Sequence, residues 1–139
     1  MPTANKFQDF SEQQTLAIHD WDTHVFKVAL TNSAPVATNT VLANITQISG
    51  TNGYTTGGTA ASISSSAQTA GVYKLVLGDV TFTASGGSIG PFRYAVLYND
   101  SATSDELIGY SDYGTNITIT NGASFTVDHH ATNGVLTIT

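Results

Sequence analysis

Short runs of apolar and β-branched residues, separated by turn signals about every ten residues, limit the possible folds of this chain more than any other feature. Such runs, with alternating polarity and Gly, Asn or Asp at their ends, are typical of antiparallel strands. The sequence contains about seven to eight of them, which predicts an all-β fold: an antiparallel β-sandwich or jelly roll. The sequence has no repeat of fixed period, so a solenoid or a propeller is excluded.

The clearest expected strand covers residues 92–99, with the sequence FRYAVLYN. Its apolar residues fall on both faces, which indicates a central strand buried on both sides. Further strands are expected at residues 25–31, 59–67, 72–83, 106–113, 117–119, 124–128 and 135–138. Residues 40–48 have helical apolar spacing but β-branched content, and we interpret them as a short helical turn.

The N-terminal segment differs from the rest because residues 4–18 contain neither Gly nor Pro. Phe7, Phe10, Leu16 and Ile18 give an imperfect helical stripe, which predicts a helix; the alternative is an arm that becomes ordered against a partner. We therefore expect residues 1–22 to form an N-terminal helix or arm and residues 23–139 to form a single β-domain. No signal-peptide apolar region or run of roughly 20 apolar residues is present, which predicts synthesis in a cytoplasm and no membrane association.

The composition points to docking rather than catalysis. Only 10% of the residues are charged, against about 25% in average soluble domains, while the chain contains 22 Thr, 13 Ser and 9 Asn. Neutral hydroxyls and amides cost much less to remove from water than ions do, so this surface suits binding to many copies of a partner. Proton-transfer chemistry needs ionisable groups, which are sparse here.

Charge and cysteine content exclude further classes. The net charge is −6, and no two of the four basic residues lie closer than 19 positions in the sequence, so a nucleic-acid partner is not expected. The chain contains no cysteine, which excludes a disulfide scaffold and a thiolate zinc site.

Two histidine clusters are the first candidates for chemistry. His19, Asp20, Asp22 and His24 have residue types that can bind a metal, but they also fit a polar bend that leads into the first strand. The segment 128–130, Asp-His-His, resembles part of a catalytic triad or a pH sensor, but it precedes the Asn-Gly turn at 133–134 and fits a solvated hairpin loop. We expect the structural alternative in both cases.

Two other motifs are weaker candidates for a functional site. Asp105 and Glu106 could act as paired carboxylates, yet their position next to Ser and Thr indicates a loop at a strand entry. The Gly-rich stretch 86–90 precedes a strand and lacks a following Lys-Ser or Lys-Thr, so it predicts a hairpin loop and not a phosphate loop. The sequence therefore predicts no catalytic residue, no cofactor and no metal site.

Aromatic side chains are the remaining candidates for binding, either at a protein interface or on a sugar platform. Trp21 lies in a polar stretch and is the ring most expected to be exposed or anchored against a partner. Core packing is the alternative for each ring. The candidate interface residues are Phe7, Phe10, Trp21, Tyr54, Tyr110 and Tyr113.

The order of these segments, above all KVALTNSAPVATNT at 27–40 and GPFRYAVLYND at 90–100, resembles a group of small virion structural proteins of tailed bacteriophages. The resemblance covers nearly the whole chain and implies a capsid decoration, or cement, protein. Such proteins are compact β-folds that bind the outside of the major capsid protein lattice, commonly as dimers or trimers. The resemblance thus implies a homo-oligomer located on the capsid surface of the virion, where it stabilises the assembled shell by mass action and avidity.

Three other functions fit the sequence less well. A tail or fibre-associated protein that binds a host receptor is the alternative within the virion, although fibre-like repeats are absent from the sequence. A non-catalytic carbohydrate-binding module would need exposed aromatic rings. A lysin-type enzyme would need an acid–base pair that the sequence does not supply.

Overall fold

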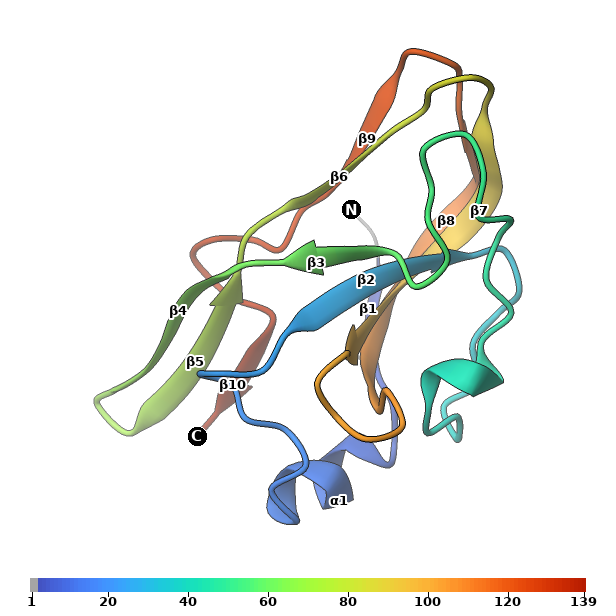
Figure 1. Ribbon diagram of the computed structural model, residues 1–139. Coiled ribbons are helices and arrows are strands. Elements are labelled where there is room, and N and C mark those ends of the chain that lie inside the picture. The colour runs from blue at the N-terminus through green and yellow to red at the C-terminus, as the bar shows by residue number, and fades with distance from the viewer. Residues whose placement is uncertain (1–2) are drawn as a thin grey trace.

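The computed structural model describes residues 3–139, which form antiparallel β-sheets with one short N-terminal helix (Figure 1). The elements are β1 (Thr3–Lys6), α1 (Phe10–Thr15), β2 (Phe26–Thr31), η1 (Leu42–Asn44), β3 (Thr59–Ala61), β4 (Ile63–Thr69), β5 (Val72–Leu77), β6 (Val80–Thr83), β7 (Ile89–Asn99), β8 (Leu107–Ile119), β9 (Ser124–Val127) and β10 (Leu136–Ile138). The mostly β, antiparallel class predicted from the sequence is confirmed. The strands form sheets of five, three and two strands, and a jelly-roll order is not shown.

The five-stranded sheet has the order β1-β8-β7-β2-β3. The prediction that residues 92–99 form a central strand is confirmed, because β7 pairs with β2 on one side and β8 on the other. Its residues are buried on both faces: Ala95 contributes to one hydrophobic cluster, and Val96 and Tyr98 contribute to the other. This two-sided burial explains why the segment is apolar at successive positions.

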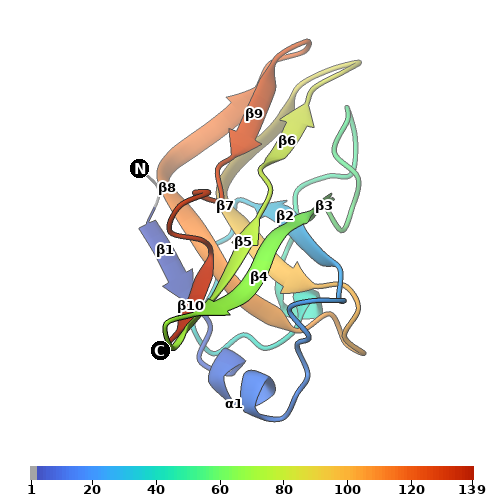
Figure 2. The ribbon, with the colours of Figure 1, turned by 90° about the vertical axis from the view of Figure 1, so that its left-hand side faces the viewer.

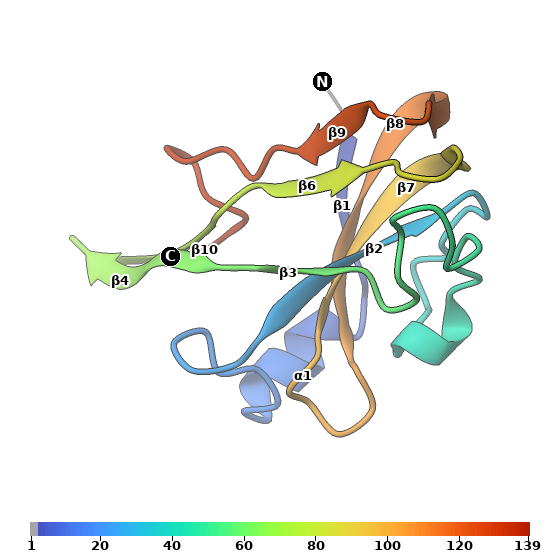
Figure 3. The same cartoon turned by 45° about the horizontal axis from the view of Figure 1, so that its top comes forward.

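The two smaller sheets, β10-β5-β4 and β6-β9, lie over one face of the five-stranded sheet (Figures 2 and 3). Phe26, Val28 and Leu30 alternate along β2 and point into the cluster between these layers, where they share a core with Leu75 of β5 and Phe82 of β6. The opposite face is covered near η1 by a smaller cluster. Its members are Phe7, Ala29, Ile45, Val96, Tyr98 and Leu107.

The chain changes sheets in the middle of two expected strands. Residues 59–67 are extended as predicted, but β3 pairs with β2 whereas β4 pairs with β5, and the change occurs at Ser62. Residues 72–83 were expected to form one strand, and this expectation is wrong: β5 pairs with β4 and β10, β6 pairs with β9, and Gly78 and Asp79 separate them. Gly58, at a φ of +76°, is required before β3, because a Cβ there would collide with the carbonyl of Val28.

Residues 107–119 form one strand, β8, rather than the two strands that were expected over 106–113 and 117–119. The ladder between β7 and β8 continues past Gly114, whose φ is +78°, through register shifts that bend the strand without ending it. Long antiparallel strands absorb extra residues in this way. The other short elements agree with prediction: η1 lies within residues 40–48, and β9 and β10 lie within the two C-terminal strands expected.

The helix predicted over residues 4–18 is much shorter than expected. Residues Thr3–Lys6 instead form β1, which pairs with residues 109–112 of β8, and α1 covers only Phe10–Thr15. Tertiary pairing overrides local helical propensity here. Phe7 and Phe10 contribute to the two different hydrophobic clusters, so the segment 1–22 proposed as a separate helix or arm supplies both a strand and core side chains.

Among the described residues, no helix combines the length and the apolar character needed to cross a membrane.

Candidate functional site

The six aromatic residues expected at an interface do not form an exposed patch. Trp21, the ring most expected to be exposed or anchored against a partner, is only 4% exposed and takes the alternative of core packing: its ring packs against Phe10 and against Tyr73 of β5, with centroids 6.1 and 5.6 Å away. Phe7, Phe10 and Tyr54 are also buried. Tyr110 and Tyr113 are partly buried and pack against Phe7 and Phe125, respectively.

Tyr54 has a structural role that its sequence context did not indicate. Its hydroxyl accepts a hydrogen bond from the backbone N–H of Leu30 at 3.0 Å and donates one to Oε1 of Gln47 at 2.7 Å. The ring thereby joins the loop after η1 to the end of β2. A tyrosine so placed is unavailable as a sugar platform in this conformation.

A buried polar network joins the N-terminal segment to the end of β7. Asn99 is fully buried, and its Nδ2 donates to Nδ1 of His19 at 3.0 Å and to Nδ1 of His24 at 2.9 Å. Its Oδ1 accepts from the backbone N–H groups of Ser101 and Ala102. Each polar group of the Asn99 side chain is therefore used, as burial requires. The two histidines of the possible metal cluster act here as hydrogen-bond acceptors.

The contacts of His19 fix its protonation state. Because Nδ1 accepts from Asn99, Nε2 carries the proton and donates to Oε1 of Gln13 at 3.0 Å. The pKa of His19 is lowered to about 4, mainly by burial; Glu106 opposes this shift and the nearby His24 adds to it. His19 is therefore neutral at pH 7 and links Gln13 to Asn99 by hydrogen bonds.

The pKa of His19 predicts acid sensitivity. An unfolded histidine takes up a proton near pH 6.5, whereas the folded His19 does so only near pH 4. The unfolded state thus binds more protons between these values, and stability falls as the pH falls from about 7 toward 4. We expect the free energy of unfolding to drop by on the order of 2 kcal/mol over this window, measured by urea denaturation. In His19→Gln the free energy of unfolding should depend less on pH over this window. Replacing the exposed His130 with Gln should leave the pH dependence unchanged. If His19→Gln shows the same pH dependence as the wild type, His19 is not its source.

Asp20 and Asp22 complete the first histidine cluster, but Asp20 caps a turn. Its carboxylate accepts from the backbone N–H groups of Asp22 and Thr23 and from the Thr23 hydroxyl, and these bonds lower the pKa of Asp20. This agrees with the interpretation as a polar bend. Within residues 3–139, no group of three or more His, Asp or Glu side chains is arranged to hold a metal ion.

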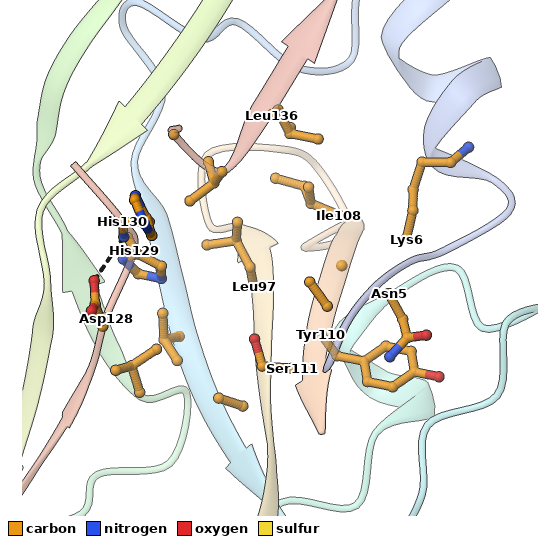
Figure 4. A pocket seen from close by; sticks show the side chains of 17 residues that line it. Asn5, Lys6, Leu97, Ile108, Tyr110, Ser111, Asp128, His129, His130 and Leu136 are labelled. Atoms are coloured by element: carbon orange, nitrogen blue, oxygen red, sulfur yellow. Dashed lines mark hydrogen bonds between the residues drawn. The ribbon is translucent and has the colours of Figure 1, made fainter. Parts of the chain in front are cut away.

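The second histidine cluster lies at the rim of a cavity of about 390 Å³, between the five-stranded sheet and the C-terminal segment (Figure 4). Nδ1 of His129 donates to the carbonyl of Gly78 at 2.8 Å, and Nδ1 of His130 accepts from the backbone N–H of Asn133 at 3.3 Å. The carboxylate of Asp128 accepts from the backbone of His130 rather than from an imidazole. These contacts do not build a triad. The segment is a loop as expected, but it is not a hairpin, because it joins β9, which pairs with β6, to β10, which pairs with β5.

The lining of this cavity is mainly apolar. Val28, Leu97 and Ile108 of the large sheet line it together with Val127 and Leu136. Figure 4 shows Asn5 and Lys6 of β1 on the side opposite His129 and His130. The cavity has the size of a small-molecule site and the chemistry of a site for an apolar group. The acidic pair at 105–106 lies outside it, in the loop between β7 and β8.

Charge is distributed unevenly over the fold. The five strands of the two smaller sheets, which form the outer layer, contain a single charged residue, Lys74. Seven of the ten acidic residues lie instead in two segments, 9–22 and 100–106. The hydrogen bonds from Asn99 to His19 and His24 hold these two segments together. Figure 1 shows α1 and the loop between β7 and β8 side by side at one end of the molecule. The protein thus has an acidic end and a neutral outer layer.

The outer layer is covered by hydroxyl groups. Thr81 and Thr83 of β6 are exposed and lie beside Thr126 and Ser124 of β9. The facing hydroxyls are hydrogen bonded, with oxygen–oxygen distances of 2.9 Å for Thr81 and Thr126 and 2.8 Å for Thr83 and Ser124. These four hydroxyls lie in a regular array on paired strands and form an uncharged surface. The alternation Thr-x-Thr in 81–83 and Ser-x-Thr in 124–126 is the sequence signal that could have located it.

All four basic side chains are engaged within the chain. Lys27 pairs with Asp100 at 3.0 Å, and Arg93 binds both carboxylate oxygens of Asp112. Lys6 donates to the hydroxyl of Ser11, and Lys74 donates to the carbonyl of Thr132.

Comparison with known proteins gives no match: no protein-family model, no curated protein and no solved structure matches this chain.

Proposed function

We propose that this protein is a bacteriophage capsid decoration protein, which binds the outside of the major capsid protein lattice and stabilises the shell. The observation that carries the proposal is the neutral, hydroxyl-covered outer layer, in which five strands contain one charged residue. Burying such a surface removes hydroxyls rather than ions from water, so many wet, hydrogen-bonded contacts can form at low desolvation cost.

The proposal includes an orientation on the shell. The β6-β9 sheet of the outer layer faces the capsid, and the acidic end, which carries residues 9–22 and 100–106, faces solvent. Acidic side chains there keep their hydration when the protein binds. The finer fold assignment, a β-sandwich whose five-stranded sheet faces the two smaller sheets, is part of the proposal; a jelly-roll strand order is not required by it.

Binding is weak for one copy and strong for the lattice. Each copy that binds assembled shells but not free subunits shifts the equilibrium toward the assembled state. Repetition over a symmetric surface adds avidity to modest single contacts. No catalytic residue, cofactor or nucleic-acid contact is needed for this mechanism.

Co-sedimentation with expanded shells of the major capsid protein from the same virion tests the proposal. We expect saturable binding at a fixed copy ratio and shells that resist heating. Absence of binding, with the protein found on tails or bound to host-cell glycans, would instead support the tail-associated or carbohydrate-binding alternatives.

A charge placed in the hydroxyl array should weaken shell binding. Thr126→Lys and Thr126→Glu should each reduce affinity for shells by about tenfold or more, because either charge must be desolvated on docking. Both variants should keep the free energy of unfolding within about 0.5 kcal/mol, since Thr126 is exposed.

The matched controls are Thr103→Lys and Thr103→Glu, at an exposed position in the acidic end. These should leave shell binding unchanged. If only one sign of charge at residue 126 weakens binding, long-range electrostatics and not desolvation governs the contact; if neither does, the array lies outside the interface.

A further inference from the structure

One strand of the outer layer has an open edge. β4 pairs with β5 on one side, and no other strand in residues 3–139 pairs with its second side. Figures 1 and 3 show β4 on the outside of its hairpin, at one end of the molecule. The outer edge of β4 therefore presents backbone groups that another strand can reach.

The turn of this hairpin defines which backbone groups point outward. Ala70 and Gly71, with φ values of 52° and 84°, form a two-residue turn that pairs Thr69 with Val72. Pairs that flank such turns exchange hydrogen bonds, and bonding alternates along the ladder. Ser65, Ala67 and Thr69 thus bond inward to β5, whereas the N–H and C=O groups of Ser66 and Gln68 point outward.

This edge lacks the features that usually prevent edge-to-edge pairing. Native edge strands are commonly blocked by charged side chains, Pro or a bulge. Ile63–Thr69 contains no charged residue and no Pro, and its register shift lies near the start, between residues 63 and 65. The five residues that follow this shift are regular and open.

The charge of the hairpin favours another copy of the same chain as the partner. The protein carries a net charge of −6, which makes most approaches between copies repulsive. The hairpin 63–77 contains no acidic residue, and its one charge, Lys74, bonds to Thr132. Two copies can therefore approach through this hairpin without bringing carboxylates together.

We propose that β4 pairs antiparallel with β4 of a second copy across a two-fold axis at Ala67. The two three-stranded sheets then join into one continuous sheet. In this register Ser66 of each copy lies opposite Gln68 of the other. The outward-pointing N–H and C=O groups of these residues then hydrogen bond across the two strands. Ala67 faces its own copy as a non-hydrogen-bonded pair, where the strands approach most closely and a small side chain fits. A self-complementary contact of this kind closes as a dimer.

Sedimentation equilibrium of the purified full chain over a wide range of concentrations tests this dimer. We expect a monomer–dimer equilibrium for the wild-type protein. Ala67→Lys and Ala67→Glu should each raise the dimer dissociation constant by roughly tenfold or more, because like charges then face each other across the axis. Mixing these two variants should restore pairing as a heterodimer, since opposite charges then face each other.

Thr137→Lys is the matched control, because Thr137 is exposed on β10 at the other edge of the same sheet. It should leave the dimer intact. Gln68→Pro, which removes an outward N–H and the Gln68 bond to the Gly71 N–H, gives a second disruption. Circular dichroism of each variant confirms folding.

A wild-type protein that stays monomeric at every concentration, or that forms trimers, would overturn the proposal. So would a dimer that resists both Ala67 variants but is weakened by Thr137→Lys. The dimer does not depend on capsid binding, so a monomeric protein that still binds shells would reject this inference alone, and a dimer that does not bind shells would reject the proposed function alone.

Discussion

Replacing Trp21 with alanine should lower the free energy of unfolding by about 3–5 kcal/mol, the range for deleting a large buried aromatic ring. The ring contacts Phe10 of α1 and Tyr73 of β5, so its loss leaves a cavity between the N-terminal segment and the outer layer. Denaturant unfolding followed by circular dichroism measures the change. Tryptophan fluorescence is unsuitable because Trp21 is the only tryptophan.

Trp21→Phe is the matched control for packing. Nε1 of Trp21 is buried and has no hydrogen-bond partner among the described residues, so phenylalanine removes a polar group that contributes no bond there. We expect Trp21→Phe to lose less than half as much stability as Trp21→Ala. If Trp21→Ala loses less than about 1 kcal/mol, the ring is not packed in the core in solution, and an interface role for it becomes the better interpretation.

Replacing Asn99 with alanine should have an effect of similar size, about 3–5 kcal/mol. The substitution leaves His19 without its Nδ1 partner and the backbone N–H of Ser101 without its acceptor, while the Ala102 N–H keeps only the backbone carbonyl of residue 99. Each buried polar group that loses its partner costs about 1–3 kcal/mol. Chemical denaturation at pH 7 measures this loss.

Asn99→Asp gives a sharper test of the same network. The carboxylate keeps an acceptor for Ser101 and Ala102 but places a second acceptor against Nδ1 of His19 and Nδ1 of His24. Protonation of an imidazole then supplies the missing donor, so the folded state of this variant binds protons more readily than the wild type. We expect Asn99→Asp to gain stability relative to wild type as the pH falls from about 7 to 5, the window in which the wild-type protein loses it. A parallel pH dependence in both proteins would contradict the hydrogen-bond assignment.

Local patterns predicted most strands, because alternation and turn residues are properties of neighbouring positions. Residues 92–99 show this best: apolar character on both faces indicated a central strand, and β7 is central. Residues 72–83 show the limit, since the apolar pattern runs through Gly78 and Asp79 while β5 and β6 pair with strands far apart in the sequence. Pairing partners are not encoded in local periodicity.

The candidate contact residues were harder to predict for the same reason. Trp21 is surrounded by polar residues in the sequence, yet its neighbours in space include Phe10 and Tyr73. His19 and His24 suggested a metal site because their common partner, Asn99, lies about 80 positions away along the chain. The neutral outer layer depends on which strands share a sheet, so the low charged content could predict a weakly charged surface but not its position.

The pairing of β1 with β8 has a consequence for the order of events during synthesis. Thr3 pairs with Asp112, so the first strand to leave the ribosome must wait for one of the last before it can form its ladder. Closing a loop of this length carries a large entropy cost before any contact compensates it, which slows folding. Phe7, which is fully buried in the folded protein, stays exposed in the nascent chain until β7 and β8 are available to cover it. The ladder between β1 and β8 therefore forms only after β8 has been synthesised, so the N-terminal strand joins the five-stranded sheet after the strands between them are available.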